Sequence, residues 1–199
     1  STWRGFEAGQ FIELTYELDG RRLTRCFSIS SGPSHFAKTR TIEVTIRVDP
    51  NGRVTPRLRE ELEAGHFVGI SDAKGMFSLN ETTKRGPLLF IAGGSGITPL
   101  RSMLQEMFNE DYPPATTLLY YAHTADDHLF GRELERLKKR HPHIHIVKIA
   151  TQTDGRLQAQ HLVEHCRELA PQSAYICGPT GLIEHAQQLL GEFGVAASD

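Results

Sequence analysis

The sequence is poor in cysteine, has no long apolar run and carries no excess of either charge. Its three cysteines, Cys26, Cys166 and Cys177, stand far apart. Such a set indicates neither a disulfide framework nor a metal cluster and is typical of a reducing compartment. No apolar stretch approaches the roughly 20 residues of a membrane-spanning helix, and a formal net charge of -2 lacks the basic excess that nucleic acid attracts. We therefore expect a cytoplasmic protein without a membrane span and without a nucleic-acid partner.

The composition is that of an ordinary globular protein, and its pattern changes near residue 85. Hydrophobic residues make up 39% of the 199 positions and charged residues 23%, so the chain can form one large domain or two small ones. Before residue 85, short alternating segments between glycines and prolines are typical of a small antiparallel β-barrel. Strands are predicted at 10–16, 22–29, 42–48 and 67–70, with a hairpin turn at 19–20 and a short helix at 56–63.

After residue 85, buried strands alternate with amphipathic helices. The segment 98–108, for example, places Leu100, Met103 and Leu104 on one helical face. This order predicts a doubly wound parallel sheet, which binds ligands at the carboxyl ends of its strands. Strands are predicted at 88–92, 117–122, 144–150 and 174–177, and helices at 98–108, 130–137, 157–169 and 180–193. We expect two domains, a β-barrel over residues 1–84 and an α/β domain over residues 85–199.

The run at residues 88–100, LLFIAGGSGITPL, is the strongest signal of function. A buried strand ends in a turn of glycines with one serine, and Pro99 then lies in the first turn of a helix. Bare N–H groups at a helix N-terminus bind phosphate, so the turn predicts a nucleotide site. Pro99 replaces the third glycine of the dinucleotide fingerprint, and no Gly-Lys-Ser/Thr follows, which excludes a P-loop. A turn made small for packing alone is the alternative.

Two further segments give weaker signals of a binding site, and the glycine turn makes each of them more informative. The segment 177–179, CGP, ends the last predicted strand, so it would line the same crevice; alone it favours a plain strand-to-helix turn. On a predicted barrel strand, Arg25 and Phe27 share one face and Ser28 lies on the other. An arginine suits a pyrophosphate, and a ring with a hydroxyl suits a flat heterocycle. The alternative is a surface arginine beside a core phenylalanine.

The histidines raise a second hypothesis. His161 and His165 match the H-x-x-E-H pattern of zinc peptidases and would share one face of a helix. No third acidic ligand is linked to them by a motif, and the neighbouring apolar residues take the core side. The alternating histidines at 141–145 fit solvated imidazoles beside basic residues. We expect no metal site, and a zinc hydrolase is the alternative that metal analysis would test.

Taken together, the motifs resemble those of the ferredoxin–NADP reductase superfamily. Its members carry Arg-x-Tyr-Ser in a flavin barrel, Gly-x-Val/Ile-Ser/Thr soon after, Gly-Gly-x-Gly-Ile-x-Pro opening the nucleotide domain and Cys-Gly-Pro near its end. The matching segments here are RCFS at 25–28, GRVT at 52–55, GGSGITP at 93–99 and CGP at 177–179. They occur in the family's order and cover nearly the whole chain. Phe27 in place of tyrosine keeps a stacking ring without the phenol hydroxyl.

The resemblance implies a role for each matching residue. Arg25 is expected to hold the FAD pyrophosphate, Phe27 to stack on the isoalloxazine and Ser28 to hydrogen-bond near flavin N5. Further residues expected along FAD are Arg47, Val48, Gly52, Val54 and Thr55. Residues expected along the nicotinamide nucleotide are Gly94, Ser95, Gly96, Thr98, Thr124, Cys177, Gly178 and Pro179. Ser28 and Cys177 are the two expected nearest the reacting atoms.

The resemblance also implies an activity, that of an FAD-dependent oxidoreductase. Hydride would pass from NAD(P)H to FAD, and single electrons would pass to a ferredoxin-type [2Fe–2S] acceptor that feeds an oxygenase or desaturase. Since the sequence has no cysteine cluster, the iron–sulfur centre is expected in a fused module or a separate partner. The family's first barrel strand and last strand have no counterpart here, so we interpret the chain as the core of a longer protein or the partner of a ferredoxin.

Two questions stay open at the level of sequence. His123 and Arg156 favour the 2′-phosphate of NADPH, whereas Asp126 and Asp127 repel a phosphate or bind the ribose diol of NADH. The second question is whether the chain is an enzyme at all. A non-catalytic nucleotide-sensing or docking module of the same fold is the alternative, because a fold does not fix a function.

Overall fold

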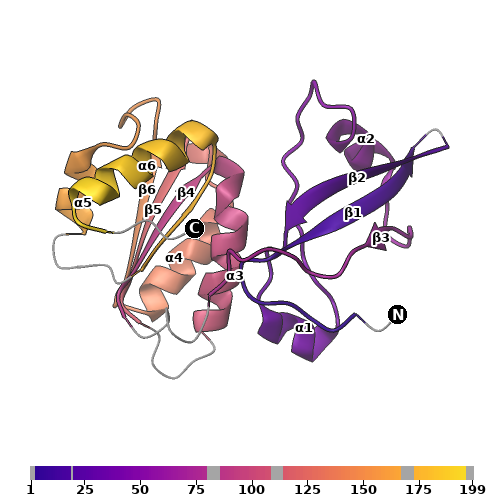
Figure 1. Cartoon of the computed structure of the whole chain (residues 1–199), viewed down its shortest axis with the longest axis horizontal. Coiled ribbons are helices and arrows are strands. Elements are labelled where there is room, and N and C mark those ends of the chain that lie inside the picture. Colours follow the sequence, from indigo (N-terminus) through magenta and orange to yellow (C-terminus); the bar gives the residue numbers. More distant parts are fainter. Residues whose placement is uncertain (1–2, 19, 80–85, 109–113, 167–172, 196–199) are drawn as a thin grey trace.

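The computed structural model describes residues 3–18, 20–79, 86–108, 114–166 and 173–195. Two units lie beside each other, with helix α3 (Ile97–Met107) standing between their sheets (Figure 1). The described residues 3–79 are called the N-terminal unit, and the described residues 86–195 the C-terminal unit.

The N-terminal unit is built on an antiparallel sheet with the strand order β2-β1-β3. Strands β1 (Phe11–Leu18) and β2 (Arg21–Ser28) form the predicted hairpin, and the short β3 (Gly69–Ile70) pairs with the other edge of β1. Helix α2 (Thr55–Glu61) covers one face of this sheet. Beneath the sheet lies a small apolar cluster, with Leu14, Val54 and Leu58 as its buried members.

One local prediction in this unit was wrong, and one helix was not predicted. Residues 42–48 alternate in hydropathy but form no strand; Val44 makes one isolated bridge, to Ile29. The physical reason is that the hydrogen bonds of Glu43 are shared with Ser30 and Ser31, so no ladder continues along the segment. Helix α1 (Pro33–Thr39) was not expected, although a proline in its first turn is a start signal. The described strands form an open sheet rather than a closed ring.

The C-terminal unit is a four-stranded parallel sheet of order β6-β5-β4-β7, covered by helices on both faces. Every residue of β4 (Leu88–Gly93) and β5 (Thr116–Ala122) is buried, which explains their continuous apolar runs. The outer strands are β6 (Ile144–Ala150) and β7 (Ser173–Cys177). Helices α3 and α4 (Gly131–Arg140) pack on one face, and α5 (Ala159–His165) and α6 (Thr180–Glu192) on the other. An antiparallel unit followed by a parallel α/β unit confirms the predicted fold class.

Some predictions fall on parts of the chain outside the described residues. The predicted helix at 157–169 is present as α5, and its last three residues lie outside them, as does the expected domain boundary between residues 84 and 85. Among the helices that the structure describes, none combines the length and the apolar character needed to cross a membrane.

The two units are in direct apolar contact. Ala8 and Leu79 of the N-terminal unit belong to the same buried cluster as Met103 of α3. The ring of Phe77 meets Tyr175 of β7 edge to face at 5.5 Å. The N-terminal unit therefore packs directly against α3 and β7.

Candidate functional site

A cleft of about 570 Å³ opens at the carboxyl ends of the parallel strands. Gly93 and Gly94 line it from the end of β4, and His123 and Thr151 from the loops after β5 and β6. Arg47 enters it from the N-terminal unit. This edge is where doubly wound sheets bind ligands, as the sequence predicted.

The two glycine turns at this edge touch each other through their backbones. A Cβ added to Gly96 would collide with the carbonyl of Cys177 and lie 2.7 Å from the amide nitrogen of Gly178. Packing therefore explains the glycine at position 96. Gly94 is different: its φ is +54°, a conformation that favours glycine, and the nearest atom to an added Cβ would be Nη1 of Arg47, at 4.0 Å. The bare backbone of Gly94 thus faces the cleft.

The glycine turn is held from below by Tyr120 of β5. Its hydroxyl donates to the carbonyl oxygen of Gly94 at 3.1 Å and accepts from the amide of Leu129 at 3.0 Å. Burial raises the pKa of Tyr120 to about 12, so the hydroxyl keeps its proton and can donate. Sequence reasoning missed this residue, although a tyrosine in a fully buried strand signals a hydrogen-bond partner.

The hydroxyl of Thr98 also shapes the turn. It donates to the carbonyl oxygen of Ser95 at 2.9 Å and is almost completely buried. Ser95 is half-buried. Of the residues predicted along the nicotinamide nucleotide, Gly94 and Pro179 line the cleft, while Gly96 and Thr98 support its floor.

The cleft has a basic lining. Arg47, His123, Arg156 and His185 contribute to it, and no carboxylate belongs to the lining among the residues that the structure describes. A concave site lined by two arginine guanidinium groups suits a ligand that carries phosphates.

The acidic residues near the cleft are bound to their own loops. The carboxylate of Asp127 accepts hydrogen bonds from the hydroxyl of Thr124 (2.7 Å) and from its amide (2.9 Å), and these bonds lower the pKa of Asp127. Asp154 accepts from the amide of Ala150 at 2.9 Å, which likewise lowers its pKa. Thr124, predicted near the ribose or its phosphate, is engaged in this capping interaction and is not part of the cleft lining.

Cys177 supplies backbone rather than an accessible thiol. Its carbonyl packs against Gly96, and its side chain is partly buried. Burial raises the pKa of this thiol, so it stays protonated and is unsuited to act as a nucleophile.

The predicted flavin residues of β2 lie where strand alternation places them. Arg25 is exposed, and its guanidinium donates to the carbonyl of Thr24 at 2.8 Å. Phe27 is half-buried and packs beside the core that contains Leu14. Ser28 is the last residue of β2, half-buried and paired with Phe11. An exposed guanidinium and an incompletely buried ring on one face fit a flat cofactor with a pyrophosphate.

The segment 48–55 is closed by its own hydrogen bonds. The amide of Gly52 donates to the carbonyl of Asp49 at 2.9 Å, and the amide of Asp49 donates to the hydroxyl of Thr55 at 2.9 Å. Val54 is buried in the small core, and Val48 is half-buried. The structure does not bring these residues into the cleft; of the predicted FAD residues, Arg47 is the one that reaches it.

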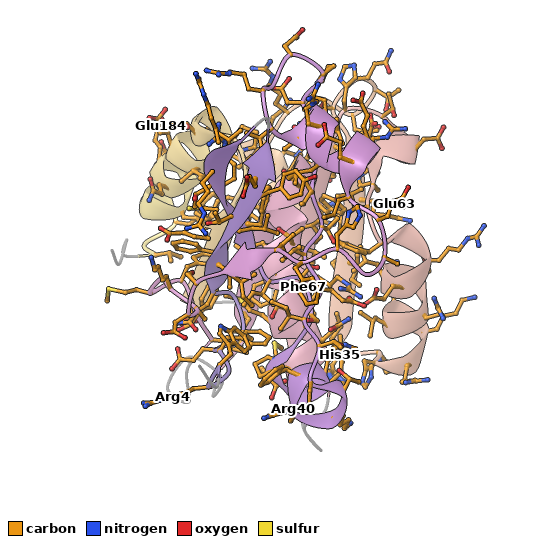
Figure 2. The ribbon with its side chains drawn as sticks, turned by 90° about the vertical axis from the view of Figure 1, so that its right-hand side faces the viewer. Arg4, His35, Arg40, Glu63, Phe67 and Glu184 are labelled. Atoms are coloured by element: carbon orange, nitrogen blue, oxygen red, sulfur yellow. The ribbon has the colours of Figure 1, made fainter. Side chains whose placement is uncertain are left out.

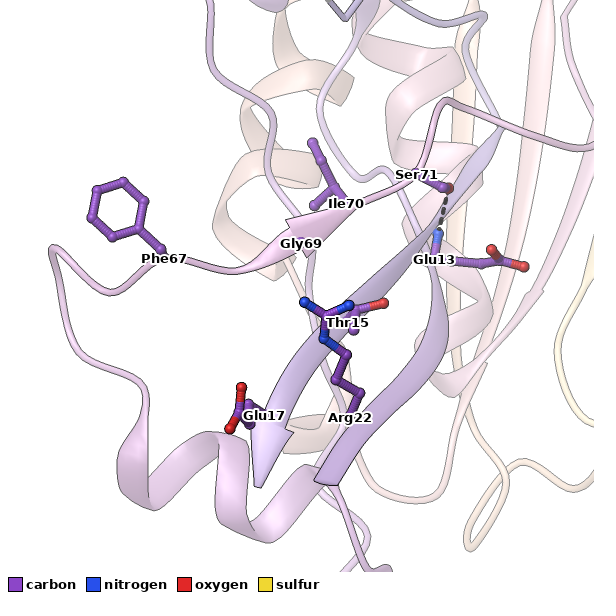
Figure 3. Close-up of a pocket in the computed structure, with 8 residues that line it drawn as sticks. All are labelled: Glu13, Thr15, Glu17, Arg22, Phe67, Gly69, Ile70 and Ser71. Carbon is purple, nitrogen blue, oxygen red and sulfur yellow. Dashed lines mark hydrogen bonds between the residues drawn. The ribbon is translucent and has the colours of Figure 1, made fainter. Parts of the chain in front are cut away.

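A second cavity, of about 440 Å³, lies on the outer face of β1 and β3 (Figure 3). Glu13, Glu17 and Arg22 contribute charged groups to it, and Phe67 points away from the other residues drawn. Phe67 is fully exposed on the face turned to the viewer in Figure 2. None of the predicted site residues lies in this cavity.

The two histidines of the H-x-x-E-H segment have separate neighbours. Nδ1 of His161 lies 3.1 Å from the hydroxyl of Tyr121, and the rings of His145 and His165 are 5.5 Å apart. Within the part of the chain that the structure describes, no three His, Cys, Asp or Glu side chains are placed to bind one metal ion.

Family models match both units. The oxidoreductase FAD-binding domain matches residues 3–79, and the oxidoreductase NAD-binding domain matches residues 90–188. The chain belongs to the ferredoxin–NADP reductase superfamily. The N-terminal unit is thus the FAD-binding part of the chain and the C-terminal unit its NAD-binding part.

Curated relatives of this chain include reductases. It is 29% identical over 192 residues to the NADPH oxidoreductase of Mycobacterium tuberculosis, covering 96% of the chain and 50% of the relative. It is 30% identical over 199 residues to the glycine betaine monooxygenase reductase subunit of Chromohalobacter salexigens, covering 95% and 53%. The chain spans about half the length of the curated relatives it matches.

Solved structures share the fold of this chain. The flavohem-like FAD/NAD-binding domain of nitric oxide dioxygenase from Vibrio cholerae matches with a TM-score of 0.80 and 22% identity, covering 97% of this chain and 82% of that one. Flavohemoglobin from Malassezia yamatoensis, with bound FAD and heme, matches with a TM-score of 0.82 and 22% identity, covering 98% and 50%. These matches support the two-unit architecture.

Proposed function

We propose that the chain is the FAD- and NAD(P)H-binding core of an electron-transfer reductase that serves a ferredoxin-type iron–sulfur acceptor. The observation that carries the proposal is the cleft itself. Its floor is the contact between the turns at Gly96 and Cys177, and Arg47 closes it from the FAD-binding unit. A nucleotide bound there would lie between the two units.

The proposed division of labour needs no acid or base from the protein. FAD, when bound, supplies the chemistry of accepting a hydride and releasing electrons one at a time. Arg25 would neutralise the pyrophosphate, Phe27 would stack on the flat ring and Ser28 would donate a hydrogen bond beside it. Gly94 would let the nicotinamide nucleotide approach, and Pro179 would border it. The protein would contribute orientation and the exclusion of water.

The remaining assignments follow the same pattern. We propose backbone and hydroxyl contacts to FAD from the segment after Arg47, and contacts to the nicotinamide nucleotide from the two turns. The residues concerned are Val48, Gly52, Val54, Thr55, Ser95, Gly96, Thr98, Thr124, Cys177 and Gly178. We also keep the proposed domains, FAD-binding over residues 1–84 and NAD(P)H-binding over residues 85–199.

Anaerobic reduction of the reconstituted protein tests this function. Protein loaded with FAD should be yellow and should lose its absorbance at about 450 nm when NADPH or NADH is added, because reduced flavin does not absorb there. A protein that binds no FAD would contradict the proposal and favour the non-catalytic sensing or docking module. Metal analysis of the same sample would distinguish the proposed reductase from a zinc hydrolase, which would contain bound zinc.

We further propose that NADPH is preferred over NADH. Arg156 and His123 line the cleft, no carboxylate among the described residues belongs to this lining, and the carboxylate of Asp127 accepts its hydrogen bonds from Thr124. Arg156→Gln should lower the preference for NADPH by about tenfold, the cost of one charge-assisted contact. Arg132→Gln, a change of the same kind on the exposed face of α4, is the control. An unchanged ratio of kcat/KM for the two nucleotides in Arg156→Gln would rule the assignment out.

The nature of the acceptor rests on relatives alone. Besides the glycine betaine system, matches include the reductase component of phenol 2-monooxygenase from a Pseudomonas strain and the electron transfer component of anthranilate 1,2-dioxygenase from Acinetobacter baylyi. We propose a [2Fe–2S] module, fused to this chain or separate, that feeds an oxygenase or desaturase in the cytoplasm. Reduction of an added plant-type ferredoxin by NADPH in the presence of the loaded protein tests the electron route; transfer to artificial dyes alone would contradict it.

A further inference from the structure

One face of helix α3 is joined to the N-terminal unit by four consecutive polar contacts. The helix positions follow the spacing i, i+1, i+4 and i+5, so they lie on one side of the helix. Their partners are backbone groups of the segment 30–34, which therefore runs along α3. With the α3 residue first, the pairs are Arg101 with Ser30 O (2.8 Å), Ser102 with Ser31 O (2.7 Å), Gln105 with Gly32 N (2.9 Å) and Glu106 with Ser34 N (2.9 Å).

Arg101 is the centre of these contacts, and it is only 9% exposed. Towards the N-terminal unit, its Nη1 also pairs with the carboxylate of Glu43 at 2.7 Å. Towards its own unit, Nε pairs with Glu133 at 3.0 Å, and the guanidinium lies 4.4 Å from the ring centre of Phe130. A guanidinium held on several sides has one geometry, and breaking a largely buried pair leaves a charge uncompensated.

These contacts begin directly behind the residues proposed to meet the two cofactors. Ser30 follows Ser28 by two positions, and Arg101 follows Thr98 by three. Any movement of α3 against the segment 30–34 would change the distance between the two cofactor sites. A misplacement of about 1 Å is enough to slow a positioned reaction by about a hundredfold.

We propose that Arg101 is a positioning residue that sets the distance between the bound nicotinamide and the bound flavin without touching either. This inference rests on the proposed function. It predicts that the interaction across the units matters for hydride transfer, whereas the interaction within the C-terminal unit does not.

The two glutamates of Arg101 make a matched pair of variants. Glu43→Gln weakens the ion pair between the units, and Glu133→Gln weakens the ion pair inside the C-terminal unit. Each variant removes one of the two carboxylate charges that pair with the guanidinium of Arg101. Arg101→Lys keeps the positive charge but loses the planar fork that reaches both sides.

The first measurement is amide hydrogen exchange on the cofactor-free chain. Arg101→Lys and Glu43→Gln should raise exchange at Gly32 and Ser34 by about tenfold, because local opening of the segment becomes easier. Glu133→Gln should leave the Ser34 amide within about twofold of the wild type. Ser34 is the residue used for this comparison, because Glu133 also accepts a hydrogen bond from Gln105, the partner of the Gly32 amide. Equal exchange in Glu43→Gln and Glu133→Gln would overturn the proposal.

The second measurement is the limiting rate of flavin reduction at saturating NADPH, under anaerobic conditions. We expect a loss of at least about tenfold in Arg101→Lys, about threefold in Glu43→Gln and less than about twofold in Glu133→Gln. Dissociation constants for FAD and NADPH should change by less than about twofold, and the primary isotope effect with 4-deuterated NADPH should rise. A merely structural residue would weaken cofactor binding or stability, and it would not slow flavin reduction while leaving the dissociation constants unchanged.

The outcomes separate the two claims. A wild type that neither NADPH nor NADH reduces would refute the proposed function, and the exchange measurement would still report on the contacts of Arg101. Faster exchange with an unchanged reduction rate would refute the positioning role while the function stands. If Arg101→Lys does not fold, the comparison of Glu43→Gln with Glu133→Gln decides.

Discussion

The two units differ most in how completely they are packed. In the C-terminal unit, helices cover both faces of the sheet, and residues such as Phe90 and Leu104 are fully buried. The N-terminal unit has a small core of its own, while Phe67 is 100% and Met76 93% exposed. Ala8 is buried against the C-terminal core instead. The comparison teaches that the nucleotide cleft stands on a self-sufficient scaffold, whereas the FAD-binding unit draws part of its order from contacts with α3.

The largest expected difference in stability is between two phenylalanine variants, one in each unit. Phe90→Ala empties a fully buried position and should cost about 3–5 kcal/mol of unfolding free energy, through lost transfer energy and a cavity. Phe67→Ala removes a ring that is already in water and should change stability by less than about 0.5 kcal/mol. Urea unfolding of both variants measures the difference. Similar losses in the two variants would mean that the contrast in packing does not hold in solution.

A glycine substitution should come next and tests the floor of the cleft. In Gly96→Ala the new methyl group meets the backbone of Cys177 and Gly178, so one turn has to shift, at a cost of about 1–3 kcal/mol. Affinity for NADPH should fall with it. Gly191→Ala is the control, because nothing lies within 4 Å of the added carbon in α6 and helix propensity improves by up to about 1 kcal/mol. A Gly96→Ala protein with normal stability and affinity would refute the contact between the turns.

The same difference in packing explains which elements the sequence predicts. Residues 88–92 and 117–122 were recognised because an apolar run between turn signals has few alternatives in an α/β pattern. Residues 42–48 alternate just as clearly and form no strand, because alternation is a local signal while a ladder needs a partner at the right register. Helix α1 was missed since its seven residues bury no side chain of their own.

The sequence predicted those parts of the site that consist of short local motifs. The glycine runs predicted the meeting of the turns at Gly96 and Cys177, because the carboxyl ends of parallel strands share one edge. Tyr120 and Arg101 were not predicted as site residues. The partners of Arg101 are 71 positions away at Ser30 and 58 at Glu43, and no local pattern encodes contacts of that length.

Removing one hydroxyl from each unit should give a smaller difference. Tyr120→Phe keeps the buried ring but leaves the carbonyl of Gly94 and the amide of Leu129 without their bonds, at about 1–2 kcal/mol. Tyr16→Phe removes a 3.2 Å bond to Glu61 at the surface of the N-terminal unit and should cost less than about 0.5 kcal/mol. Thermal unfolding reports the stabilities, and the affinity of Tyr120→Phe for NADPH reports the turn. A larger loss in Tyr16→Phe would reverse the proposed ranking of the two units.

The smallest effect concerns the loops that border the cleft. Hydrogen bonds lower the pKa of Asp127 and of Asp154 in the folded protein. A carboxyl with a depressed folded pKa stabilises the fold above its unfolded pKa, near 3.9, and this contribution is lost as pH falls through the folded value. The melting temperature should therefore decline below about pH 4, and the double variant Asp127→Asn/Asp154→Asn should show a shallower decline. If the melting temperature of the double variant declined with acid as steeply as that of the wild type, these two carboxylates would not account for the loss of stability at low pH.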